Sequence, residues 1–164
     1  MKKKLISYIL ILLITLFSLN SISLKSLDNY YITSTQDFIN YLLSDDADME
    51  GSYILTTDLD FTKGIVTYNG VTYDLEKVRL VVNPIGERMS SDGKILSSYY
   101  NPFKGSFNGG GYVIKGLIIK SAVTDNEYVG LFGYNQGIIS NLGLVDSVVE
   151  GGIHVGGIAG YNMG

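Results

Sequence analysis

Two stretches of the sequence, GLFGYNQG at Gly130–Gly137 and GIAGYNMG at Gly157–Gly164, are copies of one pattern at an offset of 27 residues. Glycine, tyrosine and asparagine occupy the same places in both copies. A period of this length is typical of a solenoid, in which each repeat is one turn of the chain stacked on the next. The repeat residues that we expect to be structural are Gly130, Gly133, Asn135 and Gly137, with Gly157, Gly160, Asn162 and Gly164 as their counterparts.

A second similarity lies beside the first. Ile114–Ile119 (IKGLII) is similar to part of Ile138–Leu144 (IISNLGL), with Ile114 set against Ile139 at an offset of 25. Offsets of 25 and 27 in adjacent segments indicate one unit with a variable turn. About three such units fit between Phe103 and Gly164.

The composition favours strands over helices. Glycine accounts for 20 of 164 residues, proline for 2 and tyrosine for 13, and 46% of the residues are hydrophobic. Glycine is poor in helix interiors, and the repeat lacks both a helical pattern and the spaced leucines of leucine-rich repeats. We therefore predict a stacked β-helix, with short strands, an apolar interior and glycines at the corners.

The repeated residues have packing roles in such a coil. Glycine and asparagine tolerate left-handed backbone angles, so we expect them to turn the corners. Asn135 and Asn162 are expected to stack one coil apart and to share side-chain hydrogen bonds. Tyr134 and Tyr161 are expected to stack in the same way on the flank.

The N-terminus has the pattern of a secretory signal peptide. Three lysines precede an uncharged run, and Ser21 and Ser23 are small residues at the positions before a cut after residue 23. The alternative is an uncleaved anchor, because the uncharged stretch Leu5–Leu24 is 20 residues long. Either hypothesis places the rest of the chain outside the cytoplasm, secreted or on the cell surface.

Charge and cysteine content restrict the partners. Removing residues 1–23 takes away three lysines and no acid, which changes the formal net charge from −4 to −7. An acidic domain is unsuited to nucleic acid, and we expect membrane contact only through the N-terminal segment. The chain has no cysteine, which excludes disulfides and thiolate chemistry.

Upstream of the repeats the chain divides into three parts. Residues 24–51 are expected to be a lead-in with a capping helix at about 35–44, where Ser34 and Asp37 mark the start and one apolar face is buried. Ser52–Phe61 is a strand candidate, and Ile65–Leu75 is a hairpin signal with Asn69-Gly70 at its turn. We expect residues 52–164 to form the β-helix, interrupted by a hairpin-rich excursion at 64–100 and cut short at its C-terminal end.

These motifs resemble the GLUG motif repeat of bacterial secreted and surface proteins. The resemblance rests on GLFGYNQG and GIAGYNMG with IISNLGL between them, and on the upstream stretches TQDFINYL, GSYILTTDLDF and NPFKGSFNGGGYVIKGLII. It implies an all-β, right-handed parallel β-helix with a short N-terminal capping helix. Because such repeats occur beside peptidase modules as well as in adhesin-like proteins, it implies no chemistry and carries over no catalytic residue.

No group of residues predicts a catalytic, cofactor or metal site. Asp58 and Asp60 lack the further acids and the turn glycine of a calcium loop. His154, the single histidine, stands where Tyr128 stands one repeat earlier, which favours a surface side chain over a general base. The acids on the last coils, among them Asp125 and Glu150, are interpreted as solubilising turns.

The tyrosines supply the one candidate binding surface. Tyrosines on a flat solenoid flank stack on sugars or anchor protein partners. Its members are Tyr112, Tyr128, Tyr134 and Tyr161. The sequence thus favours a non-catalytic scaffold or adhesin-like module that contacts a host or matrix protein or a polysaccharide. A carbohydrate-active β-helix enzyme (a polysaccharide lyase or hydrolase) and an accessory stalk of a secreted peptidase stay open as alternatives.

Overall fold

The computed structural model describes residues 29–89, 95–122 and 128–164. Within these ranges the chain forms short strands, one α-helix, α2 (Thr35–Leu42), and one 3-10 turn, η1 (Ser98–Tyr100). The expectation of a mostly β fold is therefore confirmed. The expected signal peptide, residues 1–23, lies outside the described residues.

The largest sheet joins strands that are far apart in the sequence. Its order is β1-β2-β9-β14, and each neighbouring pair is parallel. Its members are β1 (Asn29–Ile32), β2 (Ser52–Leu55), β9 (Ser106–Asn108) and β14 (Ile138–Ser140).

Four smaller sheets repeat this parallel arrangement. Two have three strands, in the orders β3-β10-β15 and β6-β11-β16, and two are the pairs β12-β17 and β13-β18. Their strands are β3 (Leu59–Asp60), β10 (Val113–Lys115), β15 (Gly143–Val145), β6 (Val81–Val82), β11 (Ile118–Lys120), β16 (Val148–Glu150), β12 (Tyr128–Val129), β17 (His154–Val155), β13 (Phe132–Asn135) and β18 (Ala159–Asn162).

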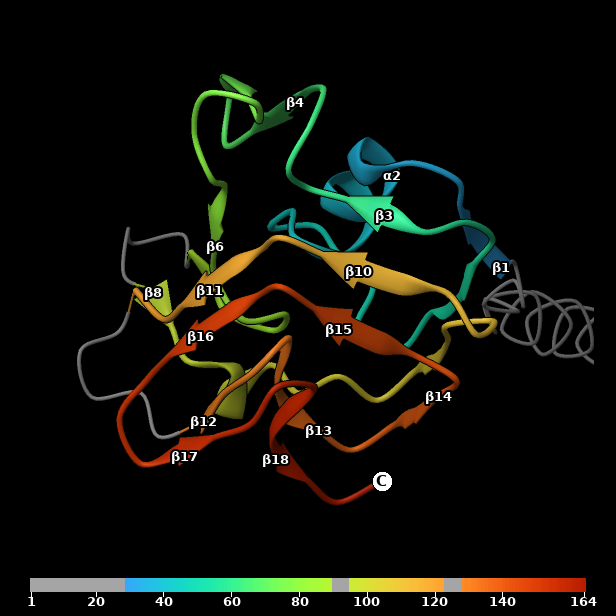
Figure 1. The fold of residues 1–164 in the computed structure, drawn as a ribbon. Coiled ribbons are helices and arrows are strands. Elements are labelled where there is room, and N and C mark those ends of the chain that lie inside the picture. Colours follow the sequence, from blue (N-terminus) through green and yellow to red (C-terminus); the bar gives the residue numbers. More distant parts are fainter. Residues whose placement is uncertain (1–28, 90–94, 123–127) are drawn as a thin grey trace, which may run out of the picture.

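The parallel pairing stacks successive turns of the chain on one another. We call each turn a pass, and the three passes are residues 52–105, 106–137 and 138–164. In the three larger parallel sheets the strand of the second pass (β9, β10 or β11) lies between a strand of the first pass and a strand of the third, as Figure 1 shows for β3, β10 and β15. The single strand candidate at Ser52–Phe61 is divided into β2 and β3, because the chain changes sheets between Leu55 and Leu59.

The register confirms one expected offset and corrects the other. Tyr134 pairs with Tyr161, at the expected offset of 27. Ile114, however, pairs with Leu144 instead of Ile139. The expected offset of 25 is wrong because the matching corners have different residues. The corner after β10 has Gly116 (φ 87°), whereas the matching corner after β15 has Asp146 (φ 47°). An alignment of glycines therefore does not detect that these corners are equivalent.

Two antiparallel hairpins leave the first pass. The first, β4 (Ile65–Tyr68) and β5 (Val71–Asp74), has positive φ at both turn residues, Asn69 (50°) and Gly70 (74°), as predicted. The second is β7 (Arg88–Met89) with β8 (Ile95–Leu96). The expected single excursion at 64–100 is thus divided, because β6 pairs with β11 and Ile85 forms a bridge with Phe132 between the two hairpins.

The core fills the interior of the first two passes. Ile114, Leu117 and Ile119 of the second pass are fully buried there, together with the rings of Phe61, Phe103, Phe107 and Phe132. The third pass is less enclosed. Its inward side chains are only partly buried and pack against that core: Ile139, Leu142, Leu144, Val149, Ile158 and Ala159.

Helix α2 closes the core beside the first pass. The Ser34 hydroxyl accepts a hydrogen bond from the Asp37 amide at the helix start, as expected. The Asp37 carboxylate in turn accepts hydrogen bonds from the Thr33 amide (3.0 Å) and the Thr33 hydroxyl (2.6 Å). The helix buries one apolar face, in which the Phe38 ring contacts the edge of Phe61 at 5.9 Å between centroids.

A column of glycines runs through the passes just before the largest sheet. Gly51, Gly105 and Gly137 each precede a strand, and Gly164 follows at the same place. A Cβ on any of the later three would overlap the carbonyl oxygen of the glycine one pass earlier. The same carbonyls accept hydrogen bonds, since Ser106 N–H binds the Gly51 oxygen and Ile138 N–H binds the Gly105 oxygen. Only glycine permits this approach of neighbouring passes.

The helix cap leads to a stability prediction. Ser34→Ala removes the acceptor of the Asp37 amide and should lower the free energy of unfolding by about 1 kcal/mol, whereas Ser34→Gly should lower it by only a few tenths. Urea denaturation followed by circular dichroism measures both. Equal losses in the two variants would contradict the capping role.

Acid should weaken the same helix start. Hydrogen bonds from the Thr33 hydroxyl, and then from backbone amides, hold the pKa of Asp37 below its usual value. A carboxyl with a lowered folded-state pKa stabilises the fold above its unfolded pKa, and this contribution is lost as pH falls through the folded pKa. Asp37→Asn should therefore destabilise the protein at pH about 6, and the difference from the wild type should shrink as pH falls through the folded-state pKa of Asp37. Asp46→Asn, in the exposed loop after the helix, is the control for general charge effects.

Candidate functional site

The tyrosine repeat builds a stack of rings on one flank. Tyr134 in β13 and Tyr161 in β18 stack with centroids 5.1 Å apart and an interplanar angle of 15°, as predicted. Beside them Tyr128 in β12 stacks on His154 in β17 at 5.1 Å and 14°. His154 therefore replaces a tyrosine at an equivalent position, as the sequence indicated.

The 3-10 turn η1, which follows the second hairpin in the first pass, adds two further tyrosines to this stack. Tyr99 of η1 stacks on Tyr128 at 6.2 Å and meets the edge of Tyr134 at 5.6 Å, and Tyr100 meets the edge of Tyr99. We call the whole group the aromatic cluster. Its members are Tyr99, Tyr100, Tyr128, Tyr134, His154 and Tyr161.

Exposure within the aromatic cluster differs from the sequence-based expectation in one place. Tyr134 is only 7% exposed, because neighbouring rings cover it, so it supports the surface instead of forming it. Tyr100 (73%), Tyr99 (54%) and Tyr161 (38%) are the most exposed tyrosines of the aromatic cluster, and Tyr128 is partly buried. Tyr112 lies elsewhere, beside Gly109–Gly111 at the turn into β10.

Asn135 and Asn162 form the expected ladder. The Asn135 amide donates to the Asn162 side-chain oxygen at 2.6 Å and to the Gly137 carbonyl at 3.0 Å. Its own side-chain oxygen accepts from the Gly137 amide at 3.1 Å. Asn135 is 2% exposed, so these bonds satisfy a buried amide.

The motif glycines do not serve as left-handed corners, which corrects the expectation. Positive φ occurs at other places in the described ranges, among them Gly110, Gly111, Asn141 and Asp146. The motif glycines instead allow close approach. A Cβ on Gly133 would overlap the buried Ser98 hydroxyl, and one on Gly130 would lie 2.6 Å from the Gly160 nitrogen. Gly157 is the exception, with open space around its Cβ position.

This difference gives a matched pair of substitutions. Gly137→Ala places a methyl group against the Gly105 backbone and should destabilise the protein by about 1–3 kcal/mol or more. Gly157→Ala should change the free energy of unfolding by less than about 0.5 kcal/mol. Thermal and urea unfolding of the two variants test the close approach, and similar losses in both would contradict it.

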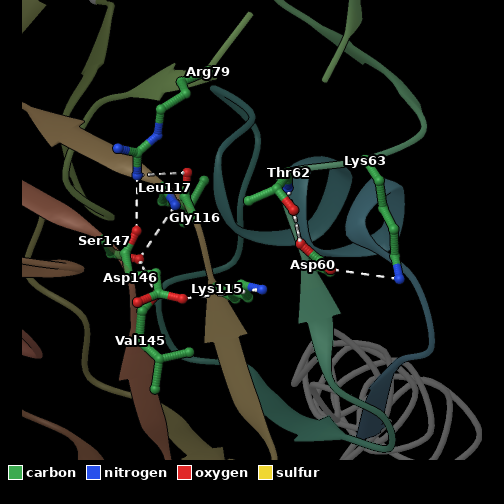
Figure 2. A network of polar contacts seen from close by, with 10 residues as sticks. All are labelled: Asp60, Thr62, Lys63, Arg79, Lys115, Gly116, Leu117, Val145, Asp146 and Ser147. Atoms are coloured by element: carbon green, nitrogen blue, oxygen red, sulfur yellow. Dashed lines mark hydrogen bonds and ion pairs between the residues drawn. The ribbon is translucent and has the colours of Figure 1, made fainter. Parts of the chain in front are cut away.

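Figure 2 shows a polar network at the corner between β10 and β11 and its counterpart in the third pass. The Arg79 guanidinium, from the segment after the first hairpin, donates to the carbonyls of Gly116 (3.2 Å) and Asp146 (2.8 Å). The Ser147 hydroxyl accepts from the Leu117 amide at 3.2 Å. Arg79 therefore joins two stacked corners. The sequence did not predict this role, because Arg79 lies within the expected excursion at 64–100.

Three of the acids considered as sites have a structural partner. The Asp58 carboxylate accepts from the Val113 amide at 2.9 Å. Asp60 accepts from the Thr62 hydroxyl and amide, which hold its pKa below the usual value, and it pairs with Lys63 at 3.5 Å (Figure 2). Glu150 pairs with Lys120 at 3.0 Å, while Asp125 lies outside the described residues.

The described residues hold no group of three or more metal-ligating side chains. Within the same ranges, α2 is too short to cross a bilayer and no longer apolar helix occurs. Comparison with protein-family models, with curated proteins and with solved structures gave no match.

Proposed function

We propose that this protein is a right-handed parallel β-helix that acts as a non-catalytic, extracytoplasmic scaffold. The observation that carries the proposal is the in-register parallel pairing of three passes, in which Tyr134 meets Tyr161 and Asn135 meets Asn162. Repeats whose side chains stack on and hydrogen-bond to those of the next repeat form an extended and rigid surface. The resemblance of its motifs to GLUG repeats supports both the handedness and the location.

The charged residues support a scaffold over an enzyme. Asp146 lies 4.0 Å from Lys115, and Glu150 pairs with Lys120, so cross-pass ion pairs use the acids of the third pass. General acid–base work on a sugar needs two carboxyl groups that face one substrate. Neither alternative, the carbohydrate-active enzyme or the peptidase stalk, has a specific observation among the described residues in its favour.

We assign the adhesive contact to the aromatic cluster, with a protein as its partner. The facing surfaces of Tyr128 and His154, and of Tyr134 and Tyr161, are covered by their own stacking. Stacking on a sugar needs a free ring face, whereas protein contacts also use ring edges and hydroxyl groups. The exposed Tyr99 and Tyr100 add ring surface and hydroxyl groups at the border of the cluster.

A binding experiment with exposed tyrosines tests the proposed contact. The full chain is applied to immobilised collagen, fibronectin and mucin, with cellulose and chitin as polysaccharide probes. We expect binding to a protein probe that Tyr100→Ala and Tyr161→Ala each weaken by about tenfold or more.

The control is Tyr31→Ala, because Tyr31 is 55% exposed in β1 and lies outside the aromatic cluster. It should leave binding unchanged. Binding to a polysaccharide alone would replace the protein partner, and an equal loss in the Tyr31 variant would remove the cluster from the contact. Binding to none of the probes would overturn the adhesive role.

A further inference from the structure

The sequence contains two asparagine-glycine pairs, Asn69-Gly70 and Asn108-Gly109. Such a pair can react within itself in water, because glycine has no side chain to keep its nitrogen away from the preceding carboxamide. The glycine nitrogen bonds to Cγ of the asparagine, and the side-chain nitrogen leaves as ammonia together with the proton of the glycine amide. The resulting succinimide ring adds water and opens either to aspartate or to isoaspartate, in which the main chain runs through the side-chain carbons. The reaction consumes only water.

The stacked passes hold the second of these pairs in place. The Gly109 amide is buried and donates to the Ser140 carbonyl of the third pass at 2.8 Å. The Asn108 side-chain oxygen accepts from the Gly110 amide at 3.0 Å and from the Asn141 side-chain amide at 3.2 Å. Because the reacting nitrogen and the reacting carboxamide are both bound, ring closure at Asn108 requires β9 to separate from β14.

The first pair lies at the exposed tip of the hairpin β4-β5, which projects from the stacked passes in Figure 1. The ladder of this hairpin ends at Tyr68 and Val71, and among the described residues the Gly70 amide donates to no acceptor. The Asn69 carboxamide contacts the Tyr68 hydroxyl, which belongs to the same hairpin. Ring closure at Asn69 therefore needs only the tip of the hairpin to open, which costs less free energy than separating two passes.

The hairpin is attached to α2 close to this turn. The Gln36 side chain accepts from the Thr67 amide at 2.8 Å and donates to the Thr67 carbonyl at 3.0 Å. Asn69 and Gly70 line a cleft of about 300 Å³ together with residues of α2 and with Asp45, which follows the helix. An isoaspartate at position 69 would add one carbon atom to the main chain of the turn and place a carboxylate in a cleft that already contains an acid.

We propose that Asn69 is a site of spontaneous conversion to isoaspartate and that this modification detaches the first hairpin from α2. A type I′ turn needs positive φ at both of its central residues, and its geometry fixes the register of the strands on either side. A main chain that is one carbon longer no longer fits this turn, so β4 shifts against β5 and Thr67 moves away from Gln36. Asn108 stays an amide as long as the passes remain stacked.

Peptide mass spectrometry of the full chain, stored at mildly alkaline pH and sampled over time, tests the site. Fragmentation that distinguishes aspartate from isoaspartate is applied to the peptides that contain Asn69 and Asn108. In the folded protein Asn69 should convert at least about tenfold faster than Asn108, whereas in concentrated urea the two should convert at similar rates. Equal rates in the folded protein, conversion of Asn69 only in urea, or a tenfold difference that persists in urea would overturn the assignment.

Amide hydrogen exchange at Thr67 tests the detachment, because this amide donates to Gln36. In the isolated isoaspartate form, exchange at Thr67 should accelerate by about tenfold or more. Asn69→Asp is the matched control, since aspartate tolerates positive φ and adds the same charge without the extra main-chain carbon. Its Thr67 amide should exchange as in the wild type. Unchanged exchange in the isoaspartate form, or an equal acceleration in Asn69→Asp, would contradict detachment through the longer main chain.

Discussion

The structure depends on how closely two neighbouring passes approach each other before β2, β9 and β14. The carbonyl oxygen of one glycine lies so close to the Cα of the glycine one pass later that the later residue has no room for a side chain. This holds for the carbonyls of Gly51, Gly105 and Gly137. Because this approach fixes where each strand begins, the hydrogen bonds from Ser106 and Ile138 to these carbonyls follow. The close approach aligns one pass with the next. The parallel register, the stacked rings and the asparagine ladder all depend on this alignment.

The part of the fold that could be predicted is the part where residue types repeat. The repeat predicted both the offset of the passes and their contacts, because like side chains stack only when the passes are in register. The pairs concerned are Tyr134 with Tyr161 and Asn135 with Asn162. The capping helix and the Asn69-Gly70 hairpin also followed from local rules of helix capping and turn conformation.

The rest could not be predicted because different residues perform the same task. Gly116 and Asp146 both adopt positive φ at matching corners, and an alignment of residue types passes over that equivalence. The role of the motif glycines was misinterpreted for a related reason: a glycine needed for close approach and one needed for positive φ look alike in a sequence. The column at Gly51, Gly105 and Gly137 did leave a signal, since each glycine directly precedes a strand of similar pattern.

The aromatic cluster shows the same limit for the candidate site. The repeat predicted the stacked pairs, but Tyr99 joins them from a segment outside the repeat, and its ring helps to bury Tyr134. Tyrosine exposure thus depends on which insertion folds back onto the flank. No count of tyrosines gives that information.

The two hairpins of the first pass have a consequence for the evolution of such a chain. Ser52 pairs with Ser106, 54 residues later, whereas Phe132 pairs with Ala159 after 27. Loop-closure entropy grows so slowly with length that doubling the separation costs only about 0.6 kcal/mol. Length changes between β3 and β6, or after Ile85, are therefore nearly neutral for the stacked passes, and new surface segments can be acquired there without disturbing the register.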